Sequence, residues 1–521
     1  MSTLVFSLLG CVMWCCILLY VFLIRPKSKL QASSAFALTN GTDRFSLGKL
    51  ASIIACLLTV LICVLPMGLS PVWNGENPQH RNQYEMMARS LSHGHIYLEY
   101  DDVDPKLEEM ENPYDPEARM LAEVREHSDH AYYKGKYYMY FGVVPAVVLF
   151  LPYYLITGKD LTTYHATQIF AALAIIGLFL LFHKLAKQYF KGMPRIMLVS
   201  LSVCLSLIPV YFSAGYPALY CTAIISGVCF EVWSLYFFFN AVYLIDGEKA
   251  KKKVIMAVIG GLLGALAFGC RPTVALGNLV LIPMLVKYIR DERTREDRVK
   301  IGRLLLRIFL VLIPYFVIGG LLMAYNYARF ENPFEFGQAL QLTGFDQTNF
   351  GKLSNFSPVE TFNGIVLNFI GFTPITGNFP YVYFNSVFVN FPILAFIFAV
   401  FGAKVRQNLK NSKMFALSVT FAAVVLFIDF MQVQWGPGMA NAERYRTDFY
   451  FLIAILAFIV IGHTFNSVEA DGKKRFSFAI GLFCLEAVFM CMLFLMIADD
   501  GSYTACYPEM LDKLKHFVLI F

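Results

Sequence analysis

The chain has 521 residues, of which 57% are hydrophobic and only 15% are charged, and its formal net charge is +6. Soluble domains carry about 25% charged residues, and here the apolar residues gather in runs of about 20, the length of a helix that crosses a bilayer. This composition excludes a soluble enzyme, a disordered chain and a nucleic-acid-binding domain, and it predicts an all-α, polytopic membrane protein.

The predicted membrane segments follow one another along the whole chain. They cover residues 4–24, 48–70, 139–157, 164–185, 196–213, 219–245, 254–270, 273–290, 304–325, 383–404, 415–434, 448–463 and 476–497. The joints between them that are rich in lysine and arginine are expected to be cytoplasmic, because positively charged loops stay inside.

This rule conflicts with the number of apolar segments near the start of the chain, because it requires an odd number of membrane crossings there. The polar stretch 71–138 should be external and the basic joint 184–195 internal, yet two apolar segments lie between them. One of the two therefore does not cross. We expect it to be segment 139–157, which is short, carries Pro145 and Pro152, and would lie on or re-enter the outer surface. About twelve spans remain, with both termini outside.

Sorting the charges by predicted side changes the meaning of the net charge. The joints predicted to be cytoplasmic carry about +19 and the external segments about −11. The basic excess thus reflects topology, and the outer face is acidic. Residues 1–47 are expected to form an extra N-terminal anchor and a cytoplasmic linker, since basic residues follow the apolar run and no small-residue cleavage site does.

Two external segments, 71–138 and 326–382, are too long to be simple connections. In the first, apolar residues from Tyr84 to Leu91 recur at helical spacing, which predicts an amphipathic helix on the membrane surface that ends at Gly94. Five tyrosines then surround Lys134-Gly135, a pattern that predicts a hairpin or an aromatic platform.

Charged residues also lie unusually close to the predicted outer boundary of the membrane. Arg271 stands in a tight turn between two spans, and Arg444 lies in the charged run that precedes another. Lone charges at this depth are costly and usually have a partner or a task. Arginine binds phosphate as a bidentate fork, whereas aromatic faces and carboxylates suit sugars. These segments fit a substrate with a phosphate at the membrane surface and a sugar above it.

With these residues in place, the chain resembles the GT-C superfamily of integral-membrane glycosyltransferases, which use polyprenyl-phosphate-linked sugars on the outer face. The phrases that carry the resemblance are NQYEMMARSLSHGHIYL, ENPYDP, DHAYYKGKYYMYFGVVP, GCRPT, RFENPFEFG and ERYRTDF, and they look like those of uncharacterised bacterial, mainly Firmicute, proteins near this superfamily. The resemblance implies a core module over 48–325 with a large first external loop at 71–163, a second external loop at 326–382, and a variable C-terminal transmembrane module over 383–521.

The resemblance also implies a catalytic carboxylate on the outer side. The acidic pair that many members carry before the first surface helix is replaced here by His80 and Arg81. The candidates for the base that deprotonates or orients the acceptor hydroxyl are then Asp129, Glu76 and Glu85, and His80 through its near-neutral pKa. Asp129 is favoured because it precedes the aromatic phrase that returns to the membrane. The alternative for Asp129 is a carboxylate that caps a turn.

The donor phosphate is expected to bind external cations, which are Arg271, Arg444 and Lys136. Side chains expected to line the acceptor and sugar site are Tyr84, Tyr137, Arg329, Glu335 and Tyr445. Structural alternatives stay open: Arg271 could snorkel to headgroups, Arg444 could pair with Glu443 or Asp448, and the tyrosines could form an interfacial belt. No metal-ligand motif is present, and a role for a divalent cation such as Mg²⁺ or Mn²⁺ is left open.

The resemblance implies a cell-membrane glycosyltransferase with an extracytoplasmic active site. It would move a hexose or pentose from a polyprenyl-phosphate-linked donor to a cell-envelope glycan, lipid or protein, with membrane lipids around it and no nucleic acid as partner. One alternative is a lipid-linked glycan transporter or flippase, in which Glu231 and Glu486 would share a path. Another is a catalytically inactive relative that binds lipid during envelope assembly.

Overall fold

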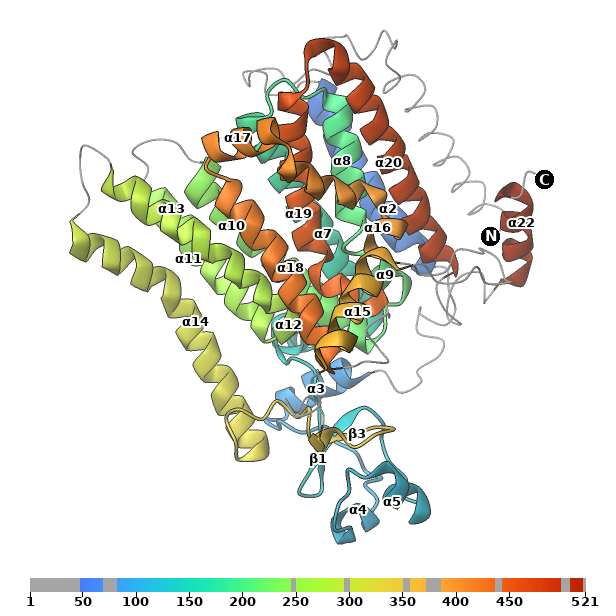
Figure 1. The fold of residues 1–521 in the computed structure, drawn as a ribbon. Helices are drawn as coiled ribbons and strands as arrows, with labels where there is room; N and C mark the ends of the chain where they lie inside the picture. The colour runs from blue at the N-terminus through green and yellow to red at the C-terminus, as the bar shows by residue number, and fades with distance from the viewer. Residues whose placement is uncertain are drawn as a thin grey trace.

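The computed structural model describes residues 47–68, 82–244, 250–294, 300–349, 357–371, 386–435, 443–497 and 507–518. Within these residues a bundle of helices carries a small extension of short helices and strands at one end (Figure 1). The predicted anchor 4–24 and the candidates Glu76 and His80 lie outside the described residues.

The helices of the bundle are α2 (Leu47–Gly68), α7 (Thr163–Tyr189), α8 (Arg195–Leu207), α9 (Tyr211–Gly215), α10 (Leu219–Phe239), η3 (Asn240–Leu244), α11 (Ala250–Phe268), α12 (Pro272–Ala275), η4 (Leu276–Val280), α13 (Leu281–Arg293), α14 (Ile301–Phe330), α15 (Pro358–Ile370), α16 (Val387–Asn390), η7 (Pro392–Phe401), α17 (Ala403–Asn411), α18 (Phe415–Trp435), α19 (Glu443–Ser467) and α20 (Ala470–Ile497). The short helix α22 (Pro508–Val518) lies apart from the bundle (Figure 1). The remaining elements are α3 (Gln83–Ser92), α4 (Lys106–Glu109), α5 (Pro116–Leu121), β1 (His130–Tyr133), β2 (Lys136–Tyr138), η2 (Ala146–Phe150), α6 (Leu151–Thr157), β3 (Gln341–Leu342) and η5 (Gln347–Asn349).

Within the described residues, seven helices are long and apolar enough to cross a membrane. The helix Ala146–Thr157, predicted not to cross, belongs to a shorter class. At 1.5 Å per residue it extends about 18 Å, well below the roughly 30 Å of a hydrocarbon core. The predicted span 383–404 is not one helix, because its described part is divided into α16, the 3₁₀-helix η7 and the start of α17. Only Phe391 separates the end of α16 from Pro392, which has no backbone N–H and begins η7.

The core of the bundle lies around α19. Of the apolar window of α19, 94% is buried among other helices, against 11% for α14. The helices packed around α19 include α8, α17, α18 and η7, whereas α14 diverges from the others at the edge of the bundle (Figure 1). Because α14 buries so little of its apolar surface in protein, most of that surface is left for lipid.

The predicted surface helix is present as α3, at the end of the bundle that carries the strands. Its apolar face buries Tyr84, Met87 and Ala88 against η2 and α6. After its last turn Gly94 adopts a φ of +82°, a conformation that side chains other than glycine's rarely take. The Gly94 N–H donates to the carbonyl of Leu91 at 3.1 Å, so the predicted glycine stop is confirmed.

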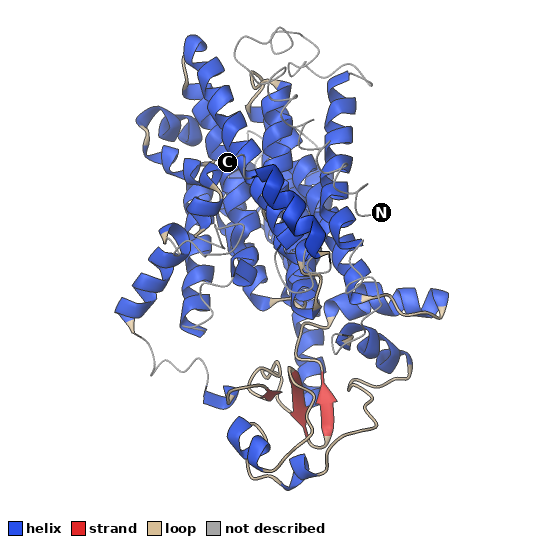
Figure 2. Ribbon diagram, turned by 90° about the vertical axis from the view of Figure 1, so that its right-hand side faces the viewer, coloured by secondary structure: helices blue, strands red, loops and turns tan. Residues whose placement is uncertain are grey.

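The predicted hairpin is also confirmed. Strands β1 and β2 pair antiparallel across Lys134-Gly135, both of which have positive φ, as a tight hairpin turn requires. The second external segment adds β3 to the other side of β1, giving the order β2-β1-β3 (Figure 2). The sequence did not predict this third strand, because a pairing between residues about 210 positions apart leaves no local pattern.

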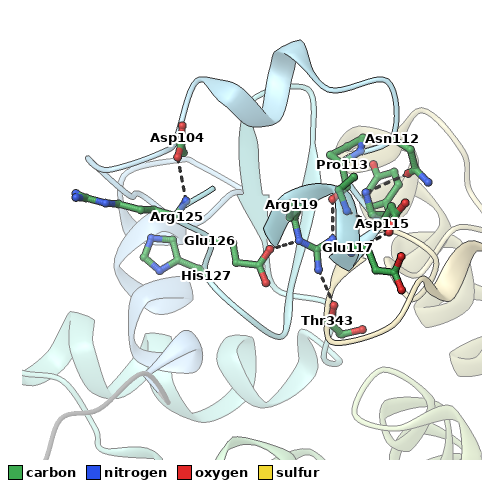
Figure 3. A network of polar contacts seen from close by, with 12 residues as sticks. Asp104, Asn112, Pro113, Asp115, Glu117, Arg119, Arg125, Glu126, His127 and Thr343 are labelled. Carbon is green, nitrogen blue, oxygen red and sulfur yellow. Dashed lines mark hydrogen bonds and ion pairs between the residues drawn. The ribbon is translucent and has the colours of Figure 1, made fainter. Parts of the chain in front are cut away.

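Arg119 fixes the two external segments to each other. Only 3% of its side chain is exposed, and its Nη1 donates to the carbonyl of Pro113 at 2.7 Å. Its Nη2 donates to the carbonyl of Thr343 at 2.5 Å, and its Nε pairs with Glu126 (Figure 3). One buried guanidinium thus links α5 to the strand region of the second segment.

Candidate functional site

Asp129 is held where the extension meets the bundle. It stands directly before β1 with a φ of +59°, and its N–H donates to the carbonyl of Leu342 at 2.9 Å. The hydroxyl of Tyr220, in the first turn of α10, donates to its Oδ2. A non-glycine residue with positive φ is uncommon, and such residues cluster at functional sites. The backbone of the extension therefore aims this carboxylate at a membrane helix.

Arg444 lies on the other side of the same tyrosine. Its guanidinium carbon is 4.4 Å from the centre of the Tyr220 ring and 4.8 Å from that of Tyr445. Its Nη2 donates to the Tyr445 hydroxyl at 2.8 Å. The sequence allowed an ion pair of Arg444 with Glu443 or Asp448, but the structure pairs those carboxylates with other arginines. Arg444 is therefore held by aromatic faces rather than neutralised.

Arg271 is anchored from one side only. Its Nε lies 2.7 and 2.9 Å from the two carboxylate oxygens of Asp448, which is fully buried. Asp448 also accepts from Thr273 Oγ1 at 2.6 Å and from Gln432 Nε2 at 2.9 Å. In the described part of the chain no acceptor bonds the two terminal nitrogens of Arg271. These remain available as a fork for an oxyanion.

The three charged residues belong to one group. The Tyr445 ring lies 5.8 Å from the guanidinium carbon of Arg271 as well as beside Arg444. Asp129, Tyr220, Arg444, Tyr445 and Arg271 thus form a continuous series of contacts, which we call the Asp129–Arg271 cluster. The predicted candidates Asp129, Arg271, Arg444 and Tyr445 are all in it.

Tyr140 completes this region. Burial raises the pKa of its hydroxyl; a hydrogen bond with Gln341 lowers it, the Asp129 carboxylate raises it, and Arg444 and Arg271 lower it. The hydroxyl is therefore within electrostatic reach of all three charged members of the cluster. The nearby Gly142 lets the backbone come this close, because a Cβ there would collide with the carbonyl oxygen of Gly269.

Tyr220 and Tyr140 were missed by sequence reasoning as members of the site. In the sequence, Tyr220 lies within an apolar span, and Tyr140 is one of several neighbouring tyrosines. A usable signal for Tyr220 would have been a phenol one residue inside the outer end of a span, beside the predicted boundary arginines. Gln432 was also missed, although an amide near the end of an apolar run is costly unless it has a partner.

Glu85 was predicted as a catalytic candidate, and the structure gives it another role. Only 8% of the residue is exposed, and its carboxylate accepts from the Thr163 backbone N–H and, at 2.8 Å, from its hydroxyl. Burial raises the pKa of Glu85 to about 7, against the opposing effect of the Thr163 bonds. Glu85 binds the first turn of α7 and faces neither water nor the cluster.

Three of the predicted sugar-site residues are packed inside the protein. Tyr84 is fully buried and its ring stacks on Phe150 at 5.2 Å. Tyr137 is 1% exposed, and its hydroxyl accepts from the His127 N–H at 3.3 Å. Arg329 is 4% exposed and donates to the carbonyl of Met139 at 2.7 Å. Their surroundings leave no open face for a sugar. The sequence did not reveal this, because local spacing cannot tell an inward-facing ring from an outward-facing one.

Lys136 and Glu335 lie away from the cluster in their contacts. Lys136 is exposed on β2, with its Nζ 4.3 Å from the centre of the Tyr97 ring. Glu335 accepts from the N–H of Gly337 at 2.6 Å and so stabilises a turn. Neither residue contacts Arg271 or Arg444 in the described chain, so of the three cations predicted to bind phosphate the cluster contains only the two arginines.

No group of three or more His, Cys, Asp or Glu side chains that could hold a metal ion occurs among the described residues. None of the cysteines in this part of the chain forms a disulfide. The described residues therefore provide no ligand set to assign to a divalent cation.

Comparisons with known proteins give a likeness of fold. No family model matches the chain, and no curated protein does. The archaeal oligosaccharyltransferase AglB from Archaeoglobus fulgidus, solved in complex with an inhibitory peptide and a dolichol-phosphate, is similar to it with 12% identity and a TM-score of 0.50, over 85% of this chain and 55% of that chain. The same organism's oligosaccharyltransferase in the apo form gives 13% identity and a TM-score of 0.48, over 85% and 56%.

The chain thus spans about half the length of the solved structures it matches. Identity this low shows the fold alone. Together with the apolar helices, the likeness of fold supports the all-α, polytopic membrane bundle that the sequence predicted.

Proposed function

We propose that this protein is a membrane glycosyltransferase of the GT-C type, which moves a sugar from a polyprenyl-phosphate-linked donor to a cell-envelope acceptor on the outer face. The observation that carries this proposal is the Asp129–Arg271 cluster. It combines one carboxylate with two arginines, through two tyrosines, where the helical bundle meets the extension. The basic joints at the opposite end of the bundle support an extracytoplasmic location.

The two arginines suit the phosphate of the donor. Arg271 is oriented by the buried Asp448 through its Nε and keeps its terminal nitrogens for a phosphate. Arg444 adds a second positive charge between two tyrosine rings. The AglB structure with dolichol-phosphate supports a lipid phosphate as the ligand of such a fold.

Asp129 is the proposed base. The acceptor hydroxyl attacks the anomeric carbon of the donor sugar, and its proton passes to the Asp129 carboxylate. The bond between that carbon and the donor phosphate oxygen breaks, and the electron pair stays on the phosphate. The resulting negative charge is stabilised by Arg271 and Arg444, which the fold positions before the reaction. Tyr220, bonded to Asp129, orients the carboxylate.

The arrangement of buried acids speaks against the transporter alternative. Glu231 is fully buried and accepts from the amide of Asn278, whose Oδ1 in turn accepts from Tyr315 at 2.6 Å. Glu486 is half-buried on α20, and no contact joins it to Glu231 within the described residues. A transport path that needs both acids in one place is therefore not favoured.

A transfer assay tests the proposal. Purified protein is given polyprenyl-phosphate-linked hexoses or pentoses and an envelope acceptor, and the glycosylated product is measured beside donor binding. We expect product with at least one donor, and a loss of donor affinity in Arg444→Gln but not in the exposed Arg125→Gln. Binding of donor without any transfer would identify the inactive relative instead. An absence of both binding and transfer would contradict the proposal.

A further inference from the structure

The end of the bundle opposite the strands holds an arginine without a partner. Arg195 is the first residue of α8, and only 8% of it is exposed. Its Nε is buried without a hydrogen bond, and no carboxylate or carbonyl of the described residues accepts from its guanidinium. A guanidinium with a buried, unpaired Nε is unfavourable, so this position favours a negatively charged ligand.

The same position is the N-terminal end of a helix, where backbone N–H groups are donors. Side chains lean towards the N-terminus of their own helix, so Arg195 projects beyond the first turn of α8. The N–H groups of that turn have no acceptors within the helix, and the residue before it, Pro194, provides no side-chain cap. Such helix ends bind phosphate through their N–H groups and the helix dipole.

The joint that leads into α8 is basic. Lys187 and Lys191 are exposed in the same joint, and residues 183–195 contain no aspartate or glutamate. The joint that leads into α8 therefore carries positive charge only.

We propose that Arg195 and the first turn of α8 form a phosphate-binding site on the cytoplasmic face, separate from the Asp129–Arg271 cluster and independent of its function. The ligand is a phosphate group, which the Arg195 fork and the helix N–H groups can bind together. The basic joint lies at the cytoplasmic boundary, where the headgroup of an inner-leaflet phospholipid supplies this group. A soluble phosphate offers the same chemistry, and the experiment distinguishes the two.

The experiment measures thermal melting of the purified full chain in detergent. The probes are phosphatidylglycerol, diacylglycerol, which lacks the phosphate, and inorganic phosphate. The variants are Arg195→Gln and Arg195→Lys, with Arg290→Gln as control, because Arg290 is an exposed arginine on a joint of the same predicted side. Arg195→Gln removes an unpaired buried charge, so without ligand it should be at least as stable as the wild type. Native mass spectrometry then counts the phospholipids that stay bound.

We expect phosphatidylglycerol to raise the melting temperature of the wild type and of Arg290→Gln, with diacylglycerol inactive. In Arg195→Gln the apparent affinity should fall about tenfold or more and one bound phospholipid should be lost, while Arg195→Lys retains part of the effect. Protection by inorganic phosphate that depends on Arg195 supports the site with a soluble source. Equal protection of Arg195→Gln and wild type, equal protection by diacylglycerol, or no protection by either phosphate compound would overturn the proposal.

Discussion

At the scale of single residues, Glu85 shows how burial changes the chemistry of a carboxylate. The side chain is almost fully enclosed between α3 and the start of α7, and its pKa is raised to about 7 from an ordinary value of 4.5. The folded protein therefore holds the Glu85 proton more tightly than the unfolded chain does. As the pH rises from about 4.5 through 7, this contribution to stability is lost, by about 3 kcal/mol at most.

We predict that Glu85→Gln reduces this loss. Glutamine keeps an oxygen that accepts from the Thr163 N–H but has no proton to lose. The melting temperature in detergent should fall less between pH 5 and pH 8 in the variant than in the wild type. The exposed Glu117→Gln serves as the matched control and should behave like the wild type. An unchanged pH dependence in Glu85→Gln would show that the side chain is already ionised when buried.

Some residues of the candidate site could be predicted from the sequence and others could not. Asp129, Arg271 and Arg444 were recognisable because charge beside a membrane boundary stands out from an apolar sequence. Tyr84 and Arg329 were predicted to meet substrate but are buried, since a sequence does not show which way a side chain faces. Tyr220 was not predicted at all, because its role depends on Asp129 being folded onto α10 from 91 positions away.

At the scale of elements, the two external segments are joined by few but strong contacts. Arg119 binds carbonyls from both of them and pairs with Glu126. The side chain of Asn112 also donates to Asp346 at 3.2 Å. These contacts hold β3 against β1, and the position of β1 determines that of Asp129.

We predict that Arg119→Ala loosens this junction. The change leaves buried acceptors without their charged donor, which should cost about 2 kcal/mol or more of local stability. Limited proteolysis of the purified protein should then cut segments 112–128 and 340–349 faster than in the wild type. Arg125→Ala is the control, because only its backbone N–H takes part in the same network (Figure 3). Equal cleavage of both variants would mean that the strand pairing alone holds the segments together.

We predict that the helix Ala146–Thr157 does not cross the membrane. If this helix does not cross, Glu109 and Lys159 lie on the outer side and Lys191 on the inner side; all three side chains are exposed. Single cysteines at these positions in intact cells should react with an impermeant maleimide at 109 and 159, and at 191 only after the membrane is opened. The unaltered protein gives the background of its own cysteines. Labelling of 109 and 159 from opposite sides would show that the helix crosses.

At the scale of the whole molecule, the helical architecture was accessible from the sequence because a bilayer imposes length and hydropathy on every span. The hairpin at Lys134-Gly135 was accessible because the turn chemistry is local. The break within 383–404 and the addition of β3 were not, since both depend on packing between distant parts of the chain. The charges are distributed between the two ends of the bundle: the basic joints lie at one end and the acidic extension lies at the other.

We propose that Asp129 and the two boundary arginines form one transfer site, and the transfer rate of Asp129→Asn measures whether they do. The rate should be compared with that of Asp115→Asn, in which asparagine can still cap the N-terminus of α5. We predict that Asp129→Asn still binds the lipid-linked donor but transfers its sugar more slowly by a factor of about 100 or more, as expected when a general base is removed. Asp115→Asn should transfer at the wild-type rate. Transfer by Asp129→Asn at the wild-type rate would contradict the account.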